Sequence, residues 1–331
     1  MEKATRIVWP RVGVVEIEEF QVGEPGPTEV LIKTLYTLIS PGTELAFLHA
    51  LPNTQHAGFP QRPGYNYVGR IVAVGAEVTD LNPGDLVIAH KGHASMARAA
   101  ANEVLSVPEG VDPRQAVYST MAAISMQAVR KAQIELGEAV AVLGQGIIGN
   151  LAGQLARLSG ALPTVAIDLV EWRLSVARAC GADMCINPGD GGLEAIRAAM
   201  GRPDVDVVLE ATGAPEAVHD ALALAGYRGR VVLLASTRGV TKEVNFYSEV
   251  HRRGIVIIGA HNAVRPKHES SQAYWTQKDD WDVALRLMAT GRLEVSRLTT
   301  DILPASEAAK GYELLRSDKA AHLGVLLDWS K

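Results

Sequence analysis

An apolar run that leads into three closely spaced glycines constrains this chain more than any other feature. Residues 140–143 read Val-Ala-Val-Leu, and Gly144, Gly146 and Gly149 follow. The first glycine permits a tight turn, the second lets a pyrophosphate approach the backbone, and the third lets the next helix pack closely on the sheet. The helix N-terminus then faces the phosphates. A purely structural glycine-rich turn is the alternative. The residues expected to bind the dinucleotide here are Gly144, Gln145, Gly146, Ile147, Ile148 and Gly149.

A carboxylate follows this turn at the distance that a dinucleotide site requires. Residues 164–168 read Thr-Val-Ala-Ile-Asp, a second buried strand that ends in Asp168 about 20 residues after the glycines, where it could accept hydrogen bonds from a ribose. Asp168 favours NAD over NADP, because a 2'-phosphate would meet like charge. Arg173 leaves mixed use open. A helix N-cap is the alternative role for Asp168.

Length and composition indicate a globular protein of two domains. The chain has 331 residues, 47% of them apolar and 21% charged, with a net charge of -5. There is no basic excess to hold nucleic acid and no apolar run long enough to cross a bilayer. The N-terminal residues lack the apolar core of a signal peptide, so we expect a cytoplasmic protein. Cys180 and Cys185 are too few for a disulfide framework, and we interpret them as packing residues.

Two patterns of secondary structure divide the sequence. Residues 1–118 contain short β-like runs broken by Gly and Pro, which predict a small barrel-like domain. From about residue 119 strands alternate with helices, which predicts a doubly wound parallel sheet over 119–262. Residues 263–331 are irregular and end in a helix and a strand, and we expect them to return to the first domain.

Four segments together resemble the medium-chain dehydrogenase/reductase superfamily across essentially the whole chain. They are Pro63-Gly-Tyr-Asn-Tyr-Val-Gly69, the Gly144 fingerprint, Glu210-Ala-Thr-Gly213 and Gly291-Arg-Leu. The resemblance implies a GroES-like β-barrel-type catalytic domain and a Rossmann domain. It also implies that the turns with Ala211 and Thr212, and with Ala235 and Ser236, pass under the adenosine and nicotinamide ribose. The glycine at 213 could instead serve only its turn.

The chain departs from this superfamily where its zinc members hold their metal. A Cys-Gly-Thr-Asp-like segment is replaced by Pro41-Gly-Thr-Glu44, and Pro-Gly-His-Glu is replaced by Pro63-Gly-Tyr-Asn66. The third ligand position falls on Thr120, and the structural zinc lobe is missing. None of these residues replaces a cysteine or histidine ligand, so we expect a zinc-independent enzyme. The chain is most similar to the branch with bacteriochlorophyllide dehydrogenase-like and polyol dehydrogenase-like members. His90 and His93 have a spacing that could chelate a metal, but two histidines do not make a site.

Without a metal, side chains must stabilise the substrate oxygen and move its proton. The resemblance places Thr43, Tyr65 and Asn66 near that oxygen. Our hypothesis is that Tyr65 acts as general acid/base and that Thr43 and Asn66 position or polarise the oxygen. Tyr65 could instead be a packed aromatic residue. Glu44 and His49 are reserve bases, but Glu44 could equally pair with an arginine and His49 could cap or line a helix.

Two further features concern ligand and partner contacts. His261 and Asn262 follow the apolar run at 255–260, where open α/β sheets place ligand contacts, although a polar strand end would look the same. The loop that follows is basic and aromatic, which suits a sizeable polar substrate as well as a solvated surface. The strand at 255–259 would form the outer edge of the sheet, and we expect a homodimer joined there.

The leading hypothesis is an NAD-dependent, zinc-independent dehydrogenase that interconverts a secondary alcohol and a ketone. Its small-molecule substrate would be a polyol, a cyclitol, or a sugar-like or hydroxyethyl-bearing compound. Reduction of an activated C=C bond, as in quinone and enoyl reductases, is the alternative within enzymes. A protein that binds NAD without turnover is the alternative outside them. The sequence does not identify the substrate, because related folds carry many specificities.

Overall fold

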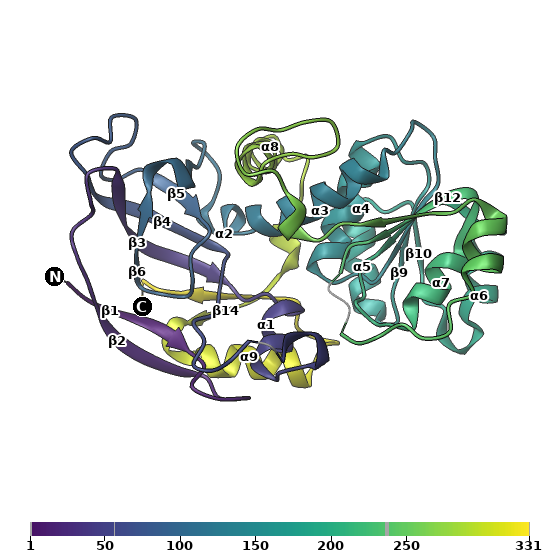
Figure 1. The fold of residues 1–331 in the computed structure, drawn as a ribbon, viewed down its shortest axis with the longest axis horizontal. Coiled ribbons are helices and arrows are strands. Elements are labelled where there is room, and N and C mark those ends of the chain that lie inside the picture. Colours follow the sequence, from purple (N-terminus) through teal and green to yellow (C-terminus); the bar gives the residue numbers. More distant parts are fainter. Residues whose placement is uncertain (1, 56, 236–237, 331) are drawn as a thin grey trace. The chain divides into compact units, whose positions relative to one another are not determined.

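The computed structural model describes residues 2–55, 57–235 and 238–330, and these form two compact units (Figure 1). One unit contains Met1–Thr120 and Lys278–Lys331, and the other contains Met121–Gln277. Both ends of the chain therefore belong to the same unit, and the middle of the chain forms the other.

The second unit is built on a parallel sheet. Within the described residues this sheet has six strands in the order β10-β9-β8-β11-β12-β13. The chain runs from β8 outward to β10 and returns to β11 on the other side of β8, so the order reverses between β8 and β11. This is the doubly wound arrangement, and the predicted fold class is confirmed. The strands are β8 (Val140–Leu143), β9 (Thr164–Ile167), β10 (Met184–Ile186), β11 (Val205–Glu210), β12 (Ala225–Leu233) and β13 (Val256–Gly259).

Continuous apolar runs explain why the inner strands of this sheet form. All four residues of β8 and of β9 are buried, as expected for strands covered on both faces. The helix α4 (Ile147–Leu158) buries Ile147, Leu151 and Leu155, which recur every four residues along one face. The remaining helices of this unit are α3 (Ser119–Ala132, which begins in the first unit), α5 (Glu171–Ala179), α6 (Gly192–Met200) and α7 (Ala217–Leu224).

The first unit is mainly β-structure and corresponds to a GroES-like domain. Its larger sheet has the order β14-β15-β3-β4-β5-β7 with β6 also paired to β3, and β1 pairs with β2 in a separate sheet within the described residues. The strands are β1 (Glu2–Val8), β2 (Glu16–Val22), β3 (Glu29–Leu38), β4 (Tyr67–Val74), β5 (Leu86–Ala89), β6 (Met96–Ala100), β7 (Val104–Ser106), β14 (Thr299–Pro304) and β15 (Gly324–Asp328). The helices are α1 (Thr43–Leu48), α2 (Pro113–Ala116), α8 (Gln277–Ala289) and α9 (Ala308–Ser317).

The core of the first unit joins the two ends of the chain. The last strand β15 pairs antiparallel with β3. Trp9 and Ile39 from the N-terminal part pack with Tyr312 and Val325 from the C-terminal part, and all four are buried. The C-terminal segment is therefore part of this core.

Both boundaries between the two units fall later in the sequence than predicted. The first falls after Thr120 rather than after 118, and the second after Gln277 rather than after 262. The segment 263–277 stays with the second unit because it is bound to α3. The Arg265 side chain donates to the Ala123 carbonyl oxygen, and the Arg130 guanidinium lies 3.6 Å from the centre of the Trp275 ring.

No helix in the described part of the chain combines the length and the apolar character that a membrane span needs.

Close backbone contact fixes the start of α4 on the sheet. A Cβ atom on Gly149 would lie 1.8 Å from the Gly144 carbonyl oxygen, so any larger residue must push the helix away from the turn. One turn later in the same helix, a Cβ on Gly153 would meet only Val142 Cγ2 at 3.8 Å, an ordinary contact.

This difference predicts opposite outcomes for two glycine-to-alanine substitutions. Gly149→Ala is expected to lower the free energy of unfolding by about 1–3 kcal/mol, because the backbone must move to admit the methyl group. The matched Gly153→Ala is expected to be neutral or to stabilise by up to about 1 kcal/mol, since alanine is the better helix former. Denaturant unfolding of both variants checks the pair, and equal effects would contradict the account.

Candidate active site

A cluster of hydroxyl groups lies where the first unit turns from β3 into α1. Tyr65, which is half-buried just before β4, donates a hydrogen bond from its Oη to Ser40 Oγ over 2.6 Å. Burial is the main cause that raises the pKa of Tyr65, to about 12. Hydrogen bonding to the Ser40 and Thr43 hydroxyls offsets part of the rise, and the negative charge of Glu44 adds to it. Tyr65 is therefore a neutral phenol at neutral pH and acts as a hydrogen-bond donor.

An imidazole covers one face of this tyrosine. The His90 ring stacks on the Tyr65 ring with 5.6 Å between the ring centres and 15° between the planes. His90 keeps contact with solvent, but partial desolvation lowers the pKa of its imidazole. A neutral imidazole beside the phenol can accept or donate a hydrogen bond at the solvent side of the cluster.

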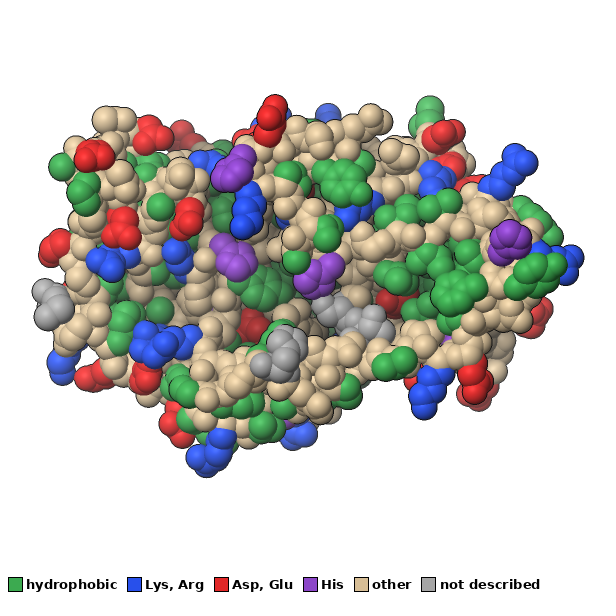
Figure 2. Space-filling view, in the orientation of Figure 1, with side chains coloured by type: hydrophobic (Ala, Val, Ile, Leu, Met, Phe, Trp, Pro, Cys, Tyr) green, Lys and Arg blue, Asp and Glu red, His purple; other side chains and the backbone are tan. Residues whose placement is uncertain are grey.

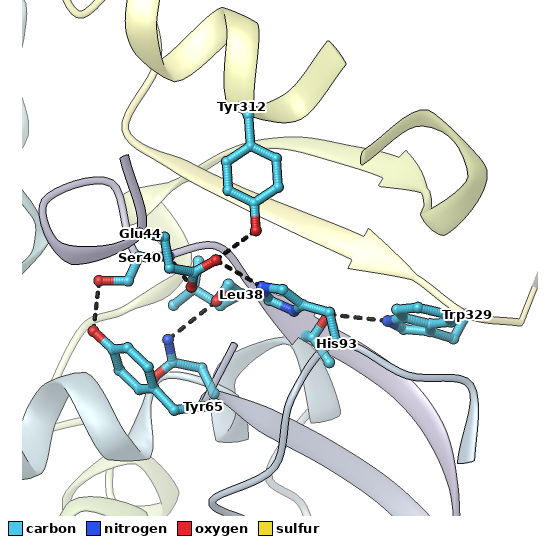
Figure 3. A network of polar contacts seen from close by, with 9 residues as sticks. Leu38, Ser40, Glu44, Tyr65, His93, Tyr312 and Trp329 are labelled. Carbon is cyan, nitrogen blue, oxygen red and sulfur yellow. Dashed lines mark hydrogen bonds and ion pairs between the residues drawn. The ribbon is translucent and has the colours of Figure 1, made fainter. Parts of the chain in front are cut away.

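Glu44 lies behind the hydroxyl cluster and inside the protein. It is 3% exposed, and its carboxylate accepts hydrogen bonds from Ser40, His93 and Tyr312 (Figure 3). Both carboxylate oxygens are thus engaged with buried donors. Glu44 pairs with a histidine rather than with an arginine, and its position favours a supporting role over that of a base open to a substrate.

The other two predicted residues of this region, Asn66 and His49, have contacts of their own. Asn66 is fully buried, and its Nδ2 donates to the Leu38 carbonyl oxygen over 3.0 Å, which ties β4 to β3. The Asn66 Oδ1 is also buried and has no hydrogen-bond partner among the described residues. His49 ends α1 and lies next to the turn at Gly13.

The positions that the resemblance assigns to the catalytic zinc ligands hold other residue types in this chain. They carry Pro41, Tyr65 and Thr120, and the Thr120 hydroxyl accepts a hydrogen bond from Trp281 Nε1 over 3.2 Å. Zinc in proteins requires Cys, His or carboxylate ligands, so this donor set does not fit the metal. His90 and His93 have different surroundings, since one stacks on Tyr65 and the other is buried against Glu44. The described residues contain no group of three or more His, Cys, Asp or Glu side chains that could hold a metal ion.

The second unit gathers the predicted dinucleotide residues at one edge of its sheet, the carboxyl ends of the parallel strands. Gly144 ends β8 with φ +88°, and α4 begins after Gly146, which provides no side-chain cap. A Cβ on Gly146 would point into open space. The uncapped helix N-terminus and this open space fit a pyrophosphate group.

Asp168 is tied to the glycine turn. Its Oδ2 accepts a hydrogen bond from the Gln145 backbone N–H over 2.6 Å, and its Oδ1 accepts one from the Val170 N–H over 2.9 Å. The Arg173 guanidinium lies 4.0 Å from the same Oδ2. The helix α5 begins after Val170, so Asp168 is not its N-cap. The Asp168 carboxylate and the Arg173 guanidinium therefore lie close together at the end of β9.

Three more predicted segments lie at the same edge. After β11, Ala211 precedes Thr212, whose backbone N–H and hydroxyl both donate to Glu210 Oε1, and burial raises the pKa of the Glu210 carboxyl. Ala235 follows β12, and its N–H donates to the Glu210 carbonyl oxygen; Ser236 lies outside the described residues. After β13, His261 Nδ1 accepts from the Ala263 N–H, and the His261 carbonyl accepts from Gln127. Asn262 is half-buried beside it.

Sequence reasoning did not assign a role to four residues of the first unit: Ser40, His90, His93 and Tyr312. In the sequence, His93 lies 49 residues from Glu44 and Tyr312 lies 268 residues from it. No local sequence pattern therefore predicts these contacts. The only available signal for Ser40 was its position at the start of the Ser-Pro-Gly-Thr-Glu segment.

Comparisons with known proteins agree with this architecture. Residues 26–133 match the family of alcohol dehydrogenase GroES-like domains, and residues 148–287 match the family of zinc-binding dehydrogenases. D-guloside 3-dehydrogenase from Escherichia coli (strain K12) is 29% identical over 254 residues, which cover 75% of this chain and 72% of that protein.

Two solved structures share the fold over nearly the whole chain. One is described as a zinc-binding dehydrogenase from Sinorhizobium meliloti 1021 bound to NADP, with a TM-score of 0.83, 23% identity, and 99% of this chain and 100% of that chain covered. The other is an alcohol dehydrogenase from E. coli CFT073 in complex with NADH, with a TM-score of 0.83, 20% identity, and 98% and 99% covered. The two family matches together span most of the sequence, and the chain belongs to the medium-chain dehydrogenase/reductase superfamily.

Proposed function

We propose that this chain is an NAD-dependent, zinc-independent dehydrogenase that interconverts a secondary alcohol and a ketone. The observation that carries the proposal is the hydroxyl cluster of Ser40, Thr43 and Tyr65. By the resemblance to zinc members of the superfamily, this cluster would lie where those members bind the metal and the substrate oxygen. The substrate class is a polyol, a cyclitol, or a sugar-like or hydroxyethyl-bearing molecule. The similarity to D-guloside 3-dehydrogenase, named for a sugar derivative, supports this class.

The cofactor assignment rests on the edge of the parallel sheet in the second unit. The start of α4 would hold the pyrophosphate, and Asp168 would accept hydrogen bonds from the adenosine ribose. The nicotinamide ring, when bound, supplies or accepts the hydride. Asp168 favours NAD, and the similar structure in complex with NADH supports that choice. Another similar structure is bound to NADP, so Arg173, the cation beside Asp168, is the residue to test for binding of a 2'-phosphate.

Tyr65 is the proposed proton donor. Since its pKa lies near 12, the phenol holds its proton at neutral pH and can donate a hydrogen bond to a carbonyl oxygen. In ketone reduction that proton would complete the alcohol as the hydride reaches carbon. Alcohol oxidation retraces the transfer and requires the phenolate, so we expect its rate to rise with pH, up to about tenfold per unit, below the pKa of Tyr65.

Replacement of Tyr65 tests this role directly. Tyr65→Phe is expected to lower the turnover number by about 100-fold or more, because general acid/base catalysis typically contributes that much. It should also abolish the rise of alcohol oxidation with pH. Steady-state rates with NADH and a panel of ketones, and with NAD and secondary alcohols, measure both effects.

Tyr67→Phe is the matched control for that substitution. Tyr67 lies two residues later, is buried, and donates to the Ile32 carbonyl oxygen beside Thr34. We expect the control to lose stability but to keep its turnover. Near-normal turnover of Tyr65→Phe in a folded protein would rule out the proposed role.

The cofactor preference has its own test. The wild-type protein is expected to bind NADH more tightly than NADPH, and Asp168→Ser should shift the ratio of the two dissociation constants toward NADPH by about tenfold or more, because like charge at the 2'-phosphate is removed. Adding Arg173→Ala to that variant should remove most of the gain. Fluorescence titration of the three proteins with each cofactor gives the six affinities, and NADPH preference in the wild type would show that Asp168 was misinterpreted.

We also propose that the chain forms a homodimer through β13. This strand is at the edge of the sheet, and Val256 is 51% and Ile257 36% exposed. Other large apolar side chains exposed in the second unit include Phe246 and Tyr247, and Figure 2 shows hydrophobic side chains gathered on this unit's part of the visible face. An apolar edge strand of this kind is normally paired or covered.

A charge on this edge is expected to dissociate the dimer. Val256→Lys should convert the protein to monomers at micromolar concentration, since the lysine would be buried opposite its own copy. Val72→Lys is the control, because Val72 is also exposed, at 42%, but lies on β4 in the first unit. Sedimentation velocity distinguishes the two variants. A wild-type protein that sediments as a monomer would refute the proposal.

A further inference from the structure

Three hydrogen-bond donors from distant parts of the first unit meet at the Glu44 carboxylate (Figure 3). The Ser40 backbone N–H donates to Oε1 over 2.9 Å, and His93 Nε2 lies 2.9 Å from Oε2. The Tyr312 hydroxyl, which comes from α9, donates to the same Oε2 over 2.5 Å. Glu44 and His93 are almost completely buried, and so is Tyr312. One carboxylate therefore connects the turn before α1, the segment after β5 and a C-terminal helix.

The two ring nitrogens of His93 have different surroundings. Its Nδ1 is buried and has no hydrogen-bond partner among the described residues. A ring that carries its proton on Nε2 donates to Glu44 and leaves no buried N–H unsatisfied. The Glu44 carboxylate then accepts a hydrogen bond from His93 Nε2 as well as those from Ser40 and Tyr312.

The same carboxylate controls the turn that presents the hydroxyl cluster. Gly42 stands at the N-cap position of α1 and provides no side chain to cap it. Glu44, in the first turn of α1, accepts the Ser40 N–H and so ties the helix to the residues before it, and the Ser40 hydroxyl in turn accepts a hydrogen bond from Tyr65 Oη. His93 also reaches the other side of the cluster, because its backbone N–H donates to the Pro63 carbonyl oxygen over 2.8 Å, two residues before Tyr65.

We propose that His93 and Tyr312 are positioning residues that act through the Glu44 carboxylate to hold the Ser40 turn and the Tyr65 hydroxyl in their reactive arrangement. The role of Tyr65 in this inference rests on the proposed function. Tyr312 is itself fixed, since its ring meets the Trp9 ring edge-on with 5.7 Å between ring centres and 78° between planes. Contacts in the core thus restrict the position of the half-buried Tyr65 phenol through Tyr312, Glu44 and Ser40.

Tyr312→Phe isolates this effect, because it removes one hydroxyl and keeps the ring. The matched control is Tyr118→Phe, in which an equally buried tyrosine of the same unit loses a hydrogen bond to Thr299 that is not connected to Glu44. Both variants should lose similar stability. Only Tyr312→Phe is expected to lower the turnover number, by about 10- to 100-fold with KM within about twofold, as a misplaced proton donor would.

A readout that does not depend on activity accompanies the kinetics. In full-length protein labelled with [13Cζ]tyrosine, the Tyr65 resonance is assigned by its loss in Tyr65→Phe. We expect this resonance and its alkaline titration to shift in Tyr312→Phe and in His93→Leu, and not in Tyr118→Phe. His93→Gln, which keeps an N–H donor toward Glu44, should recover most of the loss caused by His93→Leu.

The outcomes separate the two proposals. A Tyr65 resonance that is the same in Tyr312→Phe and in Tyr118→Phe would overturn the positioning role. A shifted resonance in a protein without dehydrogenase activity would instead support the positioning of Tyr65 and refute the proposed function.

Discussion

The first unit depends on how a single buried carboxylate is satisfied. An ionised side chain in a protein interior is stable only where hydrogen bonds replace its lost hydration, and Glu44 receives them from Ser40, His93 and Tyr312. These donors lie in the N-terminal part, in the segment after β5 and in α9. These contacts hold the C-terminal helix α9 against the N-terminal part of the unit and fix the turn that carries Ser40 and Thr43.

The second unit depends on a different constraint, which is the approach of Gly149 to the Gly144 carbonyl oxygen. That contact sets α4 against the turn after β8 and aims its N-terminus along the carboxyl edge of the sheet, where Asp168 lies. In the account developed here, one unit presents a neutral phenol and its supporting hydroxyls, and the other provides the features of a dinucleotide site. We propose that these features serve hydride transfer to or from a secondary alcohol and that Tyr65 moves the proton whose transfer a metal assists in zinc relatives.

The sequence predicted the parallel sheet well, because its evidence is local. The apolar runs at 140–143 and 164–167, the glycine spacing and Asp168 all lie within one β-α-β unit, and in the structure the glycine turn and Asp168 meet at one edge of the sheet. The support of the hydroxyl cluster could not be predicted, since Glu44 meets His93 and Tyr312 across 49 and 268 residues. The sequence indicated Glu44 and Asn66 as candidates because of their side-chain chemistry. Only the structure shows that both side chains are buried and form hydrogen bonds to other parts of the protein.

The most direct test of the account is alcohol oxidation by metal-free protein. Full-length protein would be treated with a chelator, its metal content measured, and NAD reduction followed with a panel of polyols, cyclitols and other secondary alcohols. The account predicts turnover that persists without stoichiometric zinc and does not increase when zinc is returned. Turnover that disappears with the metal and is restored by zinc would contradict it and would mean that the ligand positions at Pro41, Tyr65 and Thr120 were wrongly assigned.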